Sequence, residues 1–416
     1  MGTHGDGGVA RRQFLRGLGA TGAVLALPSL AAACGNSAAK SGGRSTGATS
    51  TLKVGVLTPL GGVFETVGKE MRNGFKLYLD THGNKLGGRK VEVVTADEGK
   101  APADATQAGQ RLIFSDKVDF VVGVVTSADA VALRDLFDQA KVPLIISNAN
   151  VTALSTTAKS PWVYRTSASF QQQGASAAKW FYDNVAKSDV WVMADDFVGG
   201  HDIAGAFTKA FADAGGKVAD SVFTPFQKTT DFQPYLTRVR NGGAKGVFAF
   251  FGGSEAIAFV KQYRSFGLFD TIPIAGQGSL ADSAVLPAEQ DDAIGWRGTG
   301  NYYVPTLDNP TNARFREQYT GAFDEEPSYY ACSSYDAGQL IDLALKKTGG
   351  KTSDADALVD ALEHPGEFDS PRGQMTMDAA THNPAEHFYV YQDAKENGKI
   401  VSKVIADTGV FTQPTG

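Results

Sequence analysis

Short apolar runs alternate with segments of helical periodicity from Thr51 onward, and Gly or Pro separates most of them. The apolar runs, rich in β-branched residues, cover residues 52–57, 91–94, 120–124, 143–146, 190–193, 218–223, 247–251 and 272–275. The helical segments between them cover residues 67–78, 103–114, 128–140, 170–185, 202–214, 232–240 and 255–266. Strict alternation of this kind predicts parallel sheets with helices on both faces. We therefore expect an α/β fold.

The alternation falls into two series of similar design. The first series ends at Tyr164-Arg165-Thr166, and the second begins at Phe170. The length of 416 residues also favours two or three units, at about 150 residues per domain. We predict two doubly wound lobes, each with a parallel sheet. A single larger enzyme domain of the same class is the alternative.

Composition excludes several classes of function. Lys and Arg total 39 against 45 Asp and Glu, so the formal net charge is −6, whereas a nucleic-acid binder needs clustered positive charge. The sequence has no strongly apolar run of the roughly 20 residues that cross a bilayer. Two cysteines, Cys34 and Cys332, cannot form a metal cluster or a disulfide framework. We expect Cys332 to be a buried, inert thiol on a helix.

The first fifty residues have the layout of an export signal followed by a tether. Arg11 and Arg12 precede Phe14 and Leu15, and a mildly apolar stretch and small residues follow, so the segment resembles a twin-arginine signal. We predict a signal at residues 1–33, a lipid anchor on Cys34 and a flexible tether through residue 50. The protein would then be exported to the periplasm or to the outer face of the cytoplasmic membrane. A segment without an export role, or an incidental cysteine beyond a plain cleavage site, is the alternative.

The loops after the strands hold the candidate site residues, because ligands of open α/β sheets bind beyond the carboxyl ends of the strands. Ser127 follows the third apolar run and opens the next helix. Its hydroxyl and the free amides of the first helical turn suit a carboxylate, although such a serine can also be an N-cap. The Gly61-Gly62 loop lacks the patterns that bind dinucleotides or phosphates. No nucleotide cofactor is expected.

Catalytic and metal-binding patterns are not found in these loops. None of the strand-end loops carries a Gly-x-Ser-x-Gly elbow. The histidines lack the i, i+4 spacing or the cysteine partners that zinc ligands typically have. We therefore expect a protein without catalytic residues, bound metal or cofactor.

Four segments, taken in order, carry a resemblance to a known family: residues 55–62 (Gly-Val-Leu-Thr-Pro-Leu-Gly-Gly), 164–166 with 172–174 (Tyr-Arg-Thr, Gln-Gln-Gly), 230–232 (Thr-Asp-Phe) and 368–373 (Phe-Asp-Ser-Pro-Arg-Gly). From Leu52 to about Ile405 the chain resembles a type I extracytoplasmic solute-binding protein of the branched-chain amino-acid (leucine/isoleucine/valine-binding) family, the receptor component of ABC importers.

The resemblance implies a periplasmic binding protein type I fold, with three crossovers between the lobes. Lobe 1 would comprise residues 51–167 and 301–373, and lobe 2 residues 168–300 and 374–416. The implied partners are a small-molecule ligand and the ABC permease subunits in the membrane, and no enzymatic activity is implied. A ligand-sensing subunit that is not coupled to transport is the alternative.

The resemblance also implies which residues bind the ligand. In that family a serine at the start of the third helix, together with backbone and hydroxyl groups after the fourth strand, holds the ligand carboxylate. These positions fall on Ser127, Ala149 and Val151, and Val151 could serve only through its backbone. Neutral Gln277 stands where an acidic residue would meet an ammonium group. Thr126 stands where some members have a cystine, and we include it in the site.

Aromatic rings near these loops bear on the choice of ligand. Phe64 and Phe197 would contribute apolar walls. Either Phe250 or Phe251 must face the core, because side chains alternate along a strand, and we assign Phe251 to the site. A buried, unpaired ammonium costs several kcal/mol. We therefore predict a small carboxylate such as an aromatic acid, with a branched-chain amino acid as the alternative.

Overall fold

The computed structural model describes residues 51–415. The predicted export signal, the anchor at Cys34 and the tether lie outside the described residues. Within residues 51–415, no helix combines the length and the apolarity that a bilayer-spanning segment requires.

The first sheet has six strands in the order β2-β3-β1-β4-β5-β6. All neighbouring strands are parallel except the short pair β2 and β3. The bounds are β1 (Leu52–Thr58), β2 (Lys85–Leu86), β3 (Arg89–Asp97), β4 (Phe120–Gly123), β5 (Leu144–Ile146) and β6 (Val163–Arg165). The first four predicted apolar runs correspond to β1, β3, β4 and β5.

The second sheet has eight strands, in the order β12-β13-β11-β10-β9-β7-β8 with β14 paired to β13. Strands β7 to β11 are parallel, whereas β12, β13 and β14 are joined by antiparallel pairing. The bounds are β7 (Val190–Asp195), β8 (Val218–Thr224), β9 (Gly246–Phe250), β10 (Ile274–Gln277), β11 (Arg297–Asn301), β12 (Met375–Asp378), β13 (Asn383–Glu396) and β14 (Lys399–Phe411). The predicted pair of mainly parallel sheets is confirmed.

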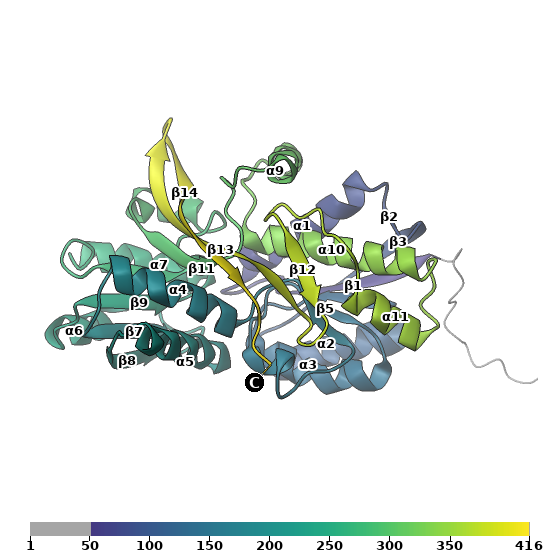
Figure 1. Ribbon diagram of the computed structural model, residues 1–416, viewed down its shortest axis with the longest axis horizontal. Coiled ribbons are helices and arrows are strands. Elements are labelled where there is room, and N and C mark those ends of the chain that lie inside the picture. The colour runs from purple at the N-terminus through teal and green to yellow at the C-terminus, as the bar shows by residue number, and fades with distance from the viewer. Residues whose placement is uncertain (1–50, 416) are drawn as a thin grey trace, which may run out of the picture. The chain divides into compact units, whose positions relative to one another are not determined.

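Helices cover both faces of each sheet (Figure 1). In lobe 1, named here for the first sheet and its helices, the bounds are α1 (Glu65–Thr81), α2 (Pro102–Gln110), η1 (Arg111–Asp116), α3 (Ser127–Ala140), η2 (Thr152–Ser155), α9 (Pro310–Phe323), α10 (Tyr329–Lys347) and α11 (Ala355–Glu363). In lobe 2, named for the second sheet, they are α4 (Phe170–Asn184), α5 (Val198–Asp213), α6 (Gln233–Asn241), α7 (Gly253–Ser265), η3 (Gly278–Leu280), α8 (Leu286–Glu289) and η4 (Gln290–Ala293).

The layers follow from the alternation of side chains along each strand. Val54 and Val56 of β1 pack in a core with Phe75 of α1 and with residues of α10 and α11. Leu57 of the same strand points the other way, into a core with Leu133 of α3. In lobe 2, α4 and α5 share one core and α6 and α7 share another. The central parallel strands of each sheet are therefore buried on both faces.

The chain crosses from one lobe to the other three times, and these three passages meet at the buried Arg372. Its guanidinium donates to Asp336 on α10 at 2.7 Å and to Glu386 on β13 at 2.6 Å. It also donates to the carbonyl of Thr166 in the first passage and lies 4.6 Å from the ring centroid of Tyr302, which follows β11. One side chain thus ties all three passages together.

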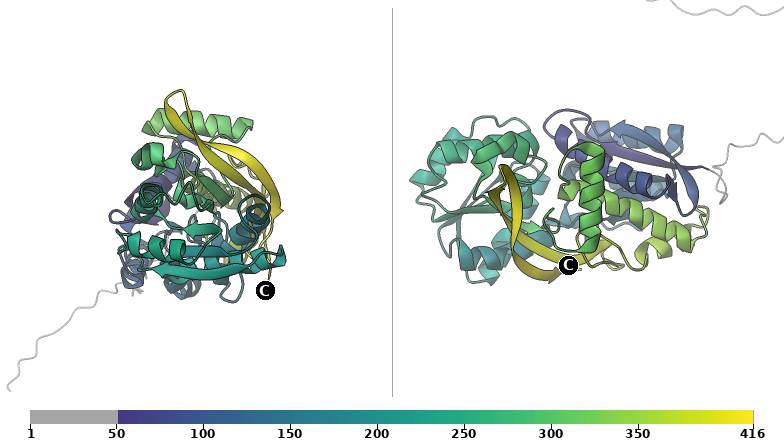
Figure 2. Two further views of the ribbon diagram at one scale, coloured as in Figure 1. Left: turned by 90° about the vertical axis from the view of Figure 1, so that its left-hand side faces the viewer. Right: turned by 90° about the horizontal axis from the view of Figure 1, so that it is seen from above.

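The C-terminal hairpin of β13 and β14 was not among the predicted elements. Its turn contains Asn397 and Gly398, both with positive φ (49° and 79°), as a two-residue hairpin turn requires. The hairpin, yellow in Figure 2, follows β12, whose Met375 packs in the core of lobe 1. The predicted boundary at 373/374 assigns Met375 to lobe 2. The segment therefore belongs to one lobe by strand pairing and to the other by packing, and the predicted lobe boundaries remain predictions.

Candidate ligand-binding site

A small cavity, which we call the inner chamber, lies where loops of both lobes meet. Its volume is about 40 Å³. It is lined by Phe64, Val67, Val125, Thr126, Ser127, Asn148, Asn150, Phe170, Phe197, Phe250, Gly252, Ser279, Tyr329 and Tyr330. Most of these residues follow the carboxyl ends of strands, which is where open α/β sheets bind ligands. None of the lining residues carries a charged side chain.

Six α-helices have their N-termini at the inner chamber, and one of them is α1, whose N-cap residue is Phe64. Ser127, Phe170 and Tyr329 are the first residues of α3, α4 and α10, while Phe197 and Gly252 are the N-cap residues of α5 and α7. The N-terminus of a helix carries unpaired amide groups and the positive end of the helix dipole. The chamber is therefore suited to a negatively charged group although it contains no cationic side chain.

The start of α3 leaves the hydroxyl of Ser127 uncommitted. Thr126 is the N-cap, because its hydroxyl accepts the amide of Asp129 at 3.2 Å and its carbonyl accepts the amide of Ala130 at 3.1 Å. The interpretation of Ser127 as the N-cap is therefore wrong. Among residues 51–415, none hydrogen-bonds the Ser127 hydroxyl or accepts the amides of Ser127 and Ala128, so these three donors can serve a ligand.

An internal carboxyl group lies beneath the start of α3. Glu98 accepts the amides of Val125 and Thr126, each at 2.8 Å. Burial, together with the neighbouring carboxyl of Asp129, raises the pKa of Glu98 well above its ordinary value. The raised pKa means that this pair tends to retain a proton, which reduces its repulsion of an anion in the chamber.

The loop after β5 faces the chamber with different residues from those predicted. Ala149 and Val151 point into the core of lobe 1, and both their carbonyls accept hydrogen bonds from Arg165. The Ala149 amide donates to the carbonyl of Val124. Asn148 and Asn150 line the chamber instead, because side chains of an extended segment alternate.

The aromatic wall differs from the prediction at one position. Phe64 and Phe197 line the chamber as expected, but Phe251 is fully buried in the core beside Phe232 and Phe259. Phe250, one residue earlier at the end of β9, faces the chamber. The assignment of Phe251 is therefore corrected to Phe250, and the cause is again the alternation of side chains.

Gln277 lies outside the set of residues that line the chamber. Its Nε2 donates to Oε1 of Gln173 at 2.8 Å, and its Oε1 accepts the amide of Ser279 at 2.7 Å. The side chain is 2% exposed. It thus caps the short helix η3, and its neighbour Ser279 reaches the chamber in its place.

Several residues of the chamber were not predicted. Tyr329 and Tyr330 come from the first turn of α10, which Ser328 caps by accepting the amide of Ala331 at 3.2 Å. Asn148 and Asn150 each have a buried side-chain oxygen without a partner among the described residues. The sequence signal for Asn148 and Asn150 is that polar side chains alternate directly after a buried strand. The signal for the two tyrosines is the helix-capping Ser328 before an apolar helix.

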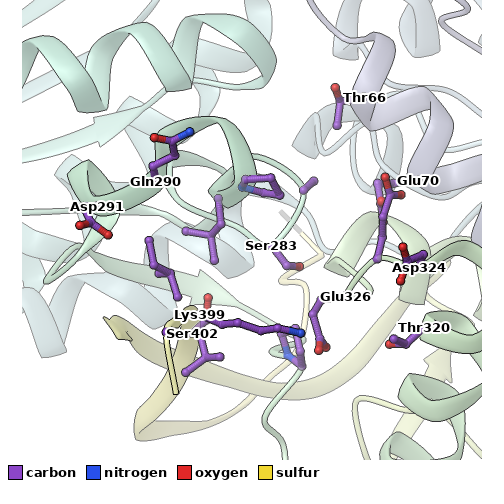
Figure 3. A pocket seen from close by; sticks show the side chains of 18 residues that line it. Thr66, Glu70, Ser283, Gln290, Asp291, Thr320, Asp324, Glu326, Lys399 and Ser402 are labelled. Carbon is purple, nitrogen blue, oxygen red and sulfur yellow. The ribbon is translucent and has the colours of Figure 1, made fainter. Parts of the chain in front are cut away.

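A larger cavity of about 660 Å³, here called the acidic groove, adjoins residues of both lobes (Figure 3). Glu70, Asp324 and Glu326 lie on one side of it, with Asp291 on the other. Lys399 is the only basic residue among the 18 residues that line it. Because like charges repel, this groove is unsuited to a carboxylate ligand despite its size.

The remaining sequence predictions concern cysteine and metal. Cys332 lies fully buried on α10, and burial raises the pKa of its thiol well above the ordinary value. The predicted buried position on a helix is confirmed, and a thiol with a raised pKa is a poor nucleophile. Within the described part of the chain, no group of three or more His, Cys, Asp or Glu residues could hold a metal ion.

Comparison with protein families shows one match that covers most of the chain. Residues 51–399 match the family described as periplasmic binding protein. A relative from Brucella melitensis, the Leu/Ile/Val-binding protein homolog 6, is 34% identical over 360 residues, which are 85% of this chain and 90% of that protein.

Solved structures give the same assignment. A solute-binding protein of an ABC transporter from R. palustris, in complex with benzoate, is 30% identical and has a TM-score of 0.81 over 87% of this chain and 97% of that chain. A solute-binding protein from Rhodopseudomonas palustris BisB5, in complex with 3,4-dihydroxybenzoic acid, is 30% identical with a TM-score of 0.82, and 88% and 99% of the two chains are covered. Both structures are of solute-binding proteins of ABC transporters. The chain belongs to the periplasmic binding protein family and is a type I solute-binding protein of the ABC-transporter class.

Proposed function

We propose that the protein captures a small aromatic carboxylate of the benzoate class in the inner chamber and delivers it to an ABC importer. The observation that carries this proposal is the chemistry of the chamber wall. Rings from both lobes enclose a space without charged side chains, at which six α-helices begin. A flat apolar body suits the rings, and a carboxylate suits the amides and hydroxyl at the start of α3.

The same wall disfavours an α-amino acid. An amino acid would bring an ammonium group into the chamber, and none of the lining residues is a carboxylate that could pair with it. Leaving a buried charge unpaired costs several kcal/mol. Gln277 does not supply the missing partner, because its side chain is bonded to Gln173 and Ser279.

The relatives support both the proposal and its alternative. The structures from Rhodopseudomonas palustris contain benzoate and 3,4-dihydroxybenzoic acid, while the Brucella relative is named for leucine, isoleucine and valine. The alternative, a branched-chain amino-acid receptor, is thus favoured by a relative's name and disfavoured by the uncharged chamber.

Capture would involve a hinge motion. A chamber of about 40 Å³ holds about three waters, so entry of a ring requires the lobes to part. A ligand that contacts both lobes favours the closed state through its higher affinity for that state. We propose that the permease recognises this closed form.

Isothermal titration calorimetry on the purified protein tests the ligand class. Benzoate and 4-hydroxybenzoate are expected to bind, and cyclohexanecarboxylate, which keeps the carboxylate but lacks the flat ring, to bind more weakly. Leucine and isoleucine are expected not to bind. A panel in which only the aliphatic amino acids release heat would contradict the proposal.

Anchoring by a lipid on Cys34 is also part of the proposal. The Cys34→Ala variant, expressed in the source organism, is expected to leave the membrane fraction while keeping its ligand affinity. A variant that stays in the membrane fraction would contradict the anchor.

A further inference from the structure

We infer that Phe226 is a positioning residue for ligand retention. It holds the rings of Phe64 in lobe 1 and Phe197 in lobe 2 at the edge of the inner chamber and so slows the release of a bound ligand. The inference rests on the proposed function in one respect, because the experiment that tests it uses 4-hydroxybenzoate as the ligand. Phe226 belongs to the loop after β8, and it does not line the inner chamber itself.

A second cavity, which we call the outer chamber, adjoins the inner chamber at the ring of Phe64. This outer chamber has a volume of about 200 Å³. Its lining comes from both lobes, with Gly62, Lys100 and Asp129 from lobe 1 and Phe226 and Gln227 from lobe 2. It shares Phe64 and Thr126 with the inner chamber. The boundary between the two chambers is therefore formed partly by the ring of Phe64.

Phe226 contacts the rings on both sides of this boundary. It stacks on Phe197 of its own lobe, with ring centroids 4.1 Å apart and an interplanar angle of 9°. It meets Phe64 of the opposite lobe at 5.9 Å and 39°. Pairs of this geometry add stabilisation beyond the apolar area that they bury. Opening the lobes breaks the second pair and leaves the first intact.

The loop that carries Phe226 is fixed to the start of α7. The buried carboxyl of Glu255 accepts the amides of Gln227 at 3.2 Å and of Thr229 at 2.9 Å. The hydroxyl of Thr229 donates to the carbonyl of Pro225 at 2.9 Å. Hydrogen bonds to residues before and after Phe226 therefore fix the loop before the lobes close. Little conformational freedom is then lost when Phe64 comes into contact.

The start of α7 makes a second contact between the lobes at the same place. The amide of Ser254 donates to the carbonyl of Val63 at 3.2 Å. Gly253 has a φ of +58°, and a Cβ added there would lie 2.2 Å from that carbonyl oxygen, so the approach requires glycine. Val63 and Phe64 are consecutive residues of lobe 1. The parts of lobe 2 that they contact, the start of α7 and the loop that carries Phe226, are hydrogen-bonded to each other through Glu255. Together they form a contact between the lobes beside the inner chamber.

The test compares the ligand-free melting temperature, the affinity and the dissociation rate of the wild type, F226A and F226L for 4-hydroxybenzoate. Phe226 is half-buried on a loop, so both variants should fold with melting temperatures close to the wild type. The matched control is F223A, which removes a half-buried ring of β8 that packs against His201 at 4.0 Å, away from the chambers. Stopped-flow displacement gives the dissociation rate.

We expect F226A to release 4-hydroxybenzoate about five-fold or more faster than the wild type, from the loss of aromatic pairs, and F223A to match the wild type. F226L, which keeps apolar bulk without a ring, should fall between the two. Equal dissociation rates for F226A and wild type would overturn the inference while leaving the proposed function in place. If the wild type binds no benzoate but binds leucine, the proposed function fails, and the same rates measured with leucine decide the inference.

Discussion

The Nη2 atom of Arg372 lies 2.7 Å from Oδ2 of Asp336, and both side chains are fully buried. The same guanidinium neutralises Glu386, so R372M would leave two carboxyl groups buried without a cation. We expect R372M to lower the free energy of unfolding by about 3–5 kcal/mol, as measured by urea denaturation at pH 8.

The control for this prediction is an exposed ion pair. Lys209 and Asp213 on α5 are 2.9 Å apart and largely exposed, so K209A should change stability by less than about 1 kcal/mol. If R372M were no less stable than K209A, the three passages between the lobes would not depend on the buried arginine.

Removal of the Ser127 hydroxyl should weaken binding without loss of stability. Thr126 caps α3, so S127A keeps the cap. A hydrogen bond to a charged group contributes about 1.5–3 kcal/mol, which corresponds to at least about ten-fold in the dissociation constant for benzoate. Calorimetric titration checks the affinity. T126A is the complementary variant, since loss of the cap should cost about 1 kcal/mol of stability.

The two neighbouring phenylalanines at the end of β9, Phe250 and Phe251, should respond in opposite ways to truncation. F250A removes a ring from the chamber wall and should weaken the binding of benzoate, with a small effect on melting temperature. F251A removes a fully buried ring and should lower the free energy of unfolding by about 3–5 kcal/mol. Parallel titration and urea denaturation measure both effects. The reverse pattern would show that the strand register is wrong.

The stability of the ligand-free protein should fall as the pH rises from 5 to 8. Burial raises the pKa of Glu70 from its ordinary value of 4.5 to about 7, so in this range the folded state binds a proton that the unfolded chain has lost. The stabilisation is complete below pH 4.5 and is lost as the pH passes 7. Burial also raises the pKa of Asp282 to about 7, which adds to the slope.

The variant E70Q isolates one contribution to this slope. Glutamine can still accept the hydroxyls of Tyr319 and Ser328, but it does not titrate. Between pH 5 and 8, E70Q should lose on the order of 1–3 kcal/mol less stability than the wild type. The control E65Q changes an exposed glutamate at the start of the same helix. Parallel losses in wild type and E70Q would contradict the assignment.

Restoring a carboxylate at position 277 should not create an amino-acid site. In Q277E the new oxygen would face Oε1 of Gln173 in place of the donor at 2.8 Å. Two acceptors would then meet in a buried place, which costs about 1–3 kcal/mol of stability. Leucine titration is expected to show no binding. Strong binding of leucine by Q277E would mean that the side chain can turn into the chamber.

The sequence pattern predicted the two sheets because alternating runs and helical segments leave few possible arrangements. It did not predict the hairpin of β13 and β14, although Asn397-Gly398 is a strong turn signal. The hairpin departs from the alternation of strands and helices, because it continues an otherwise parallel sheet with antiparallel strands.

Within the site, the loops could be predicted better than the residues. Ser127, Phe64 and Phe197 were predicted and line the chamber. The error at Phe251 is a displacement of one residue, and a shift of one residue in an extended segment reverses the direction of the side chain. The predicted backbone role of Val151 remains a prediction. Gln277 was misplaced for another reason, because its bonds to Gln173 and Ser279 depend on tertiary structure.

The composition of the chamber wall also determines how ligand binding can be followed by fluorescence. The wall contains phenylalanine and tyrosine, whereas the four tryptophans of the chain, Trp162, Trp180, Trp191 and Trp296, are not among the lining residues. Tryptophan emission would therefore report lobe motion only indirectly and would stay nearly constant when a ring fills the chamber. For an optical sensor, a dye attached at the exposed Val198, beside Phe197, is better placed than any natural tryptophan.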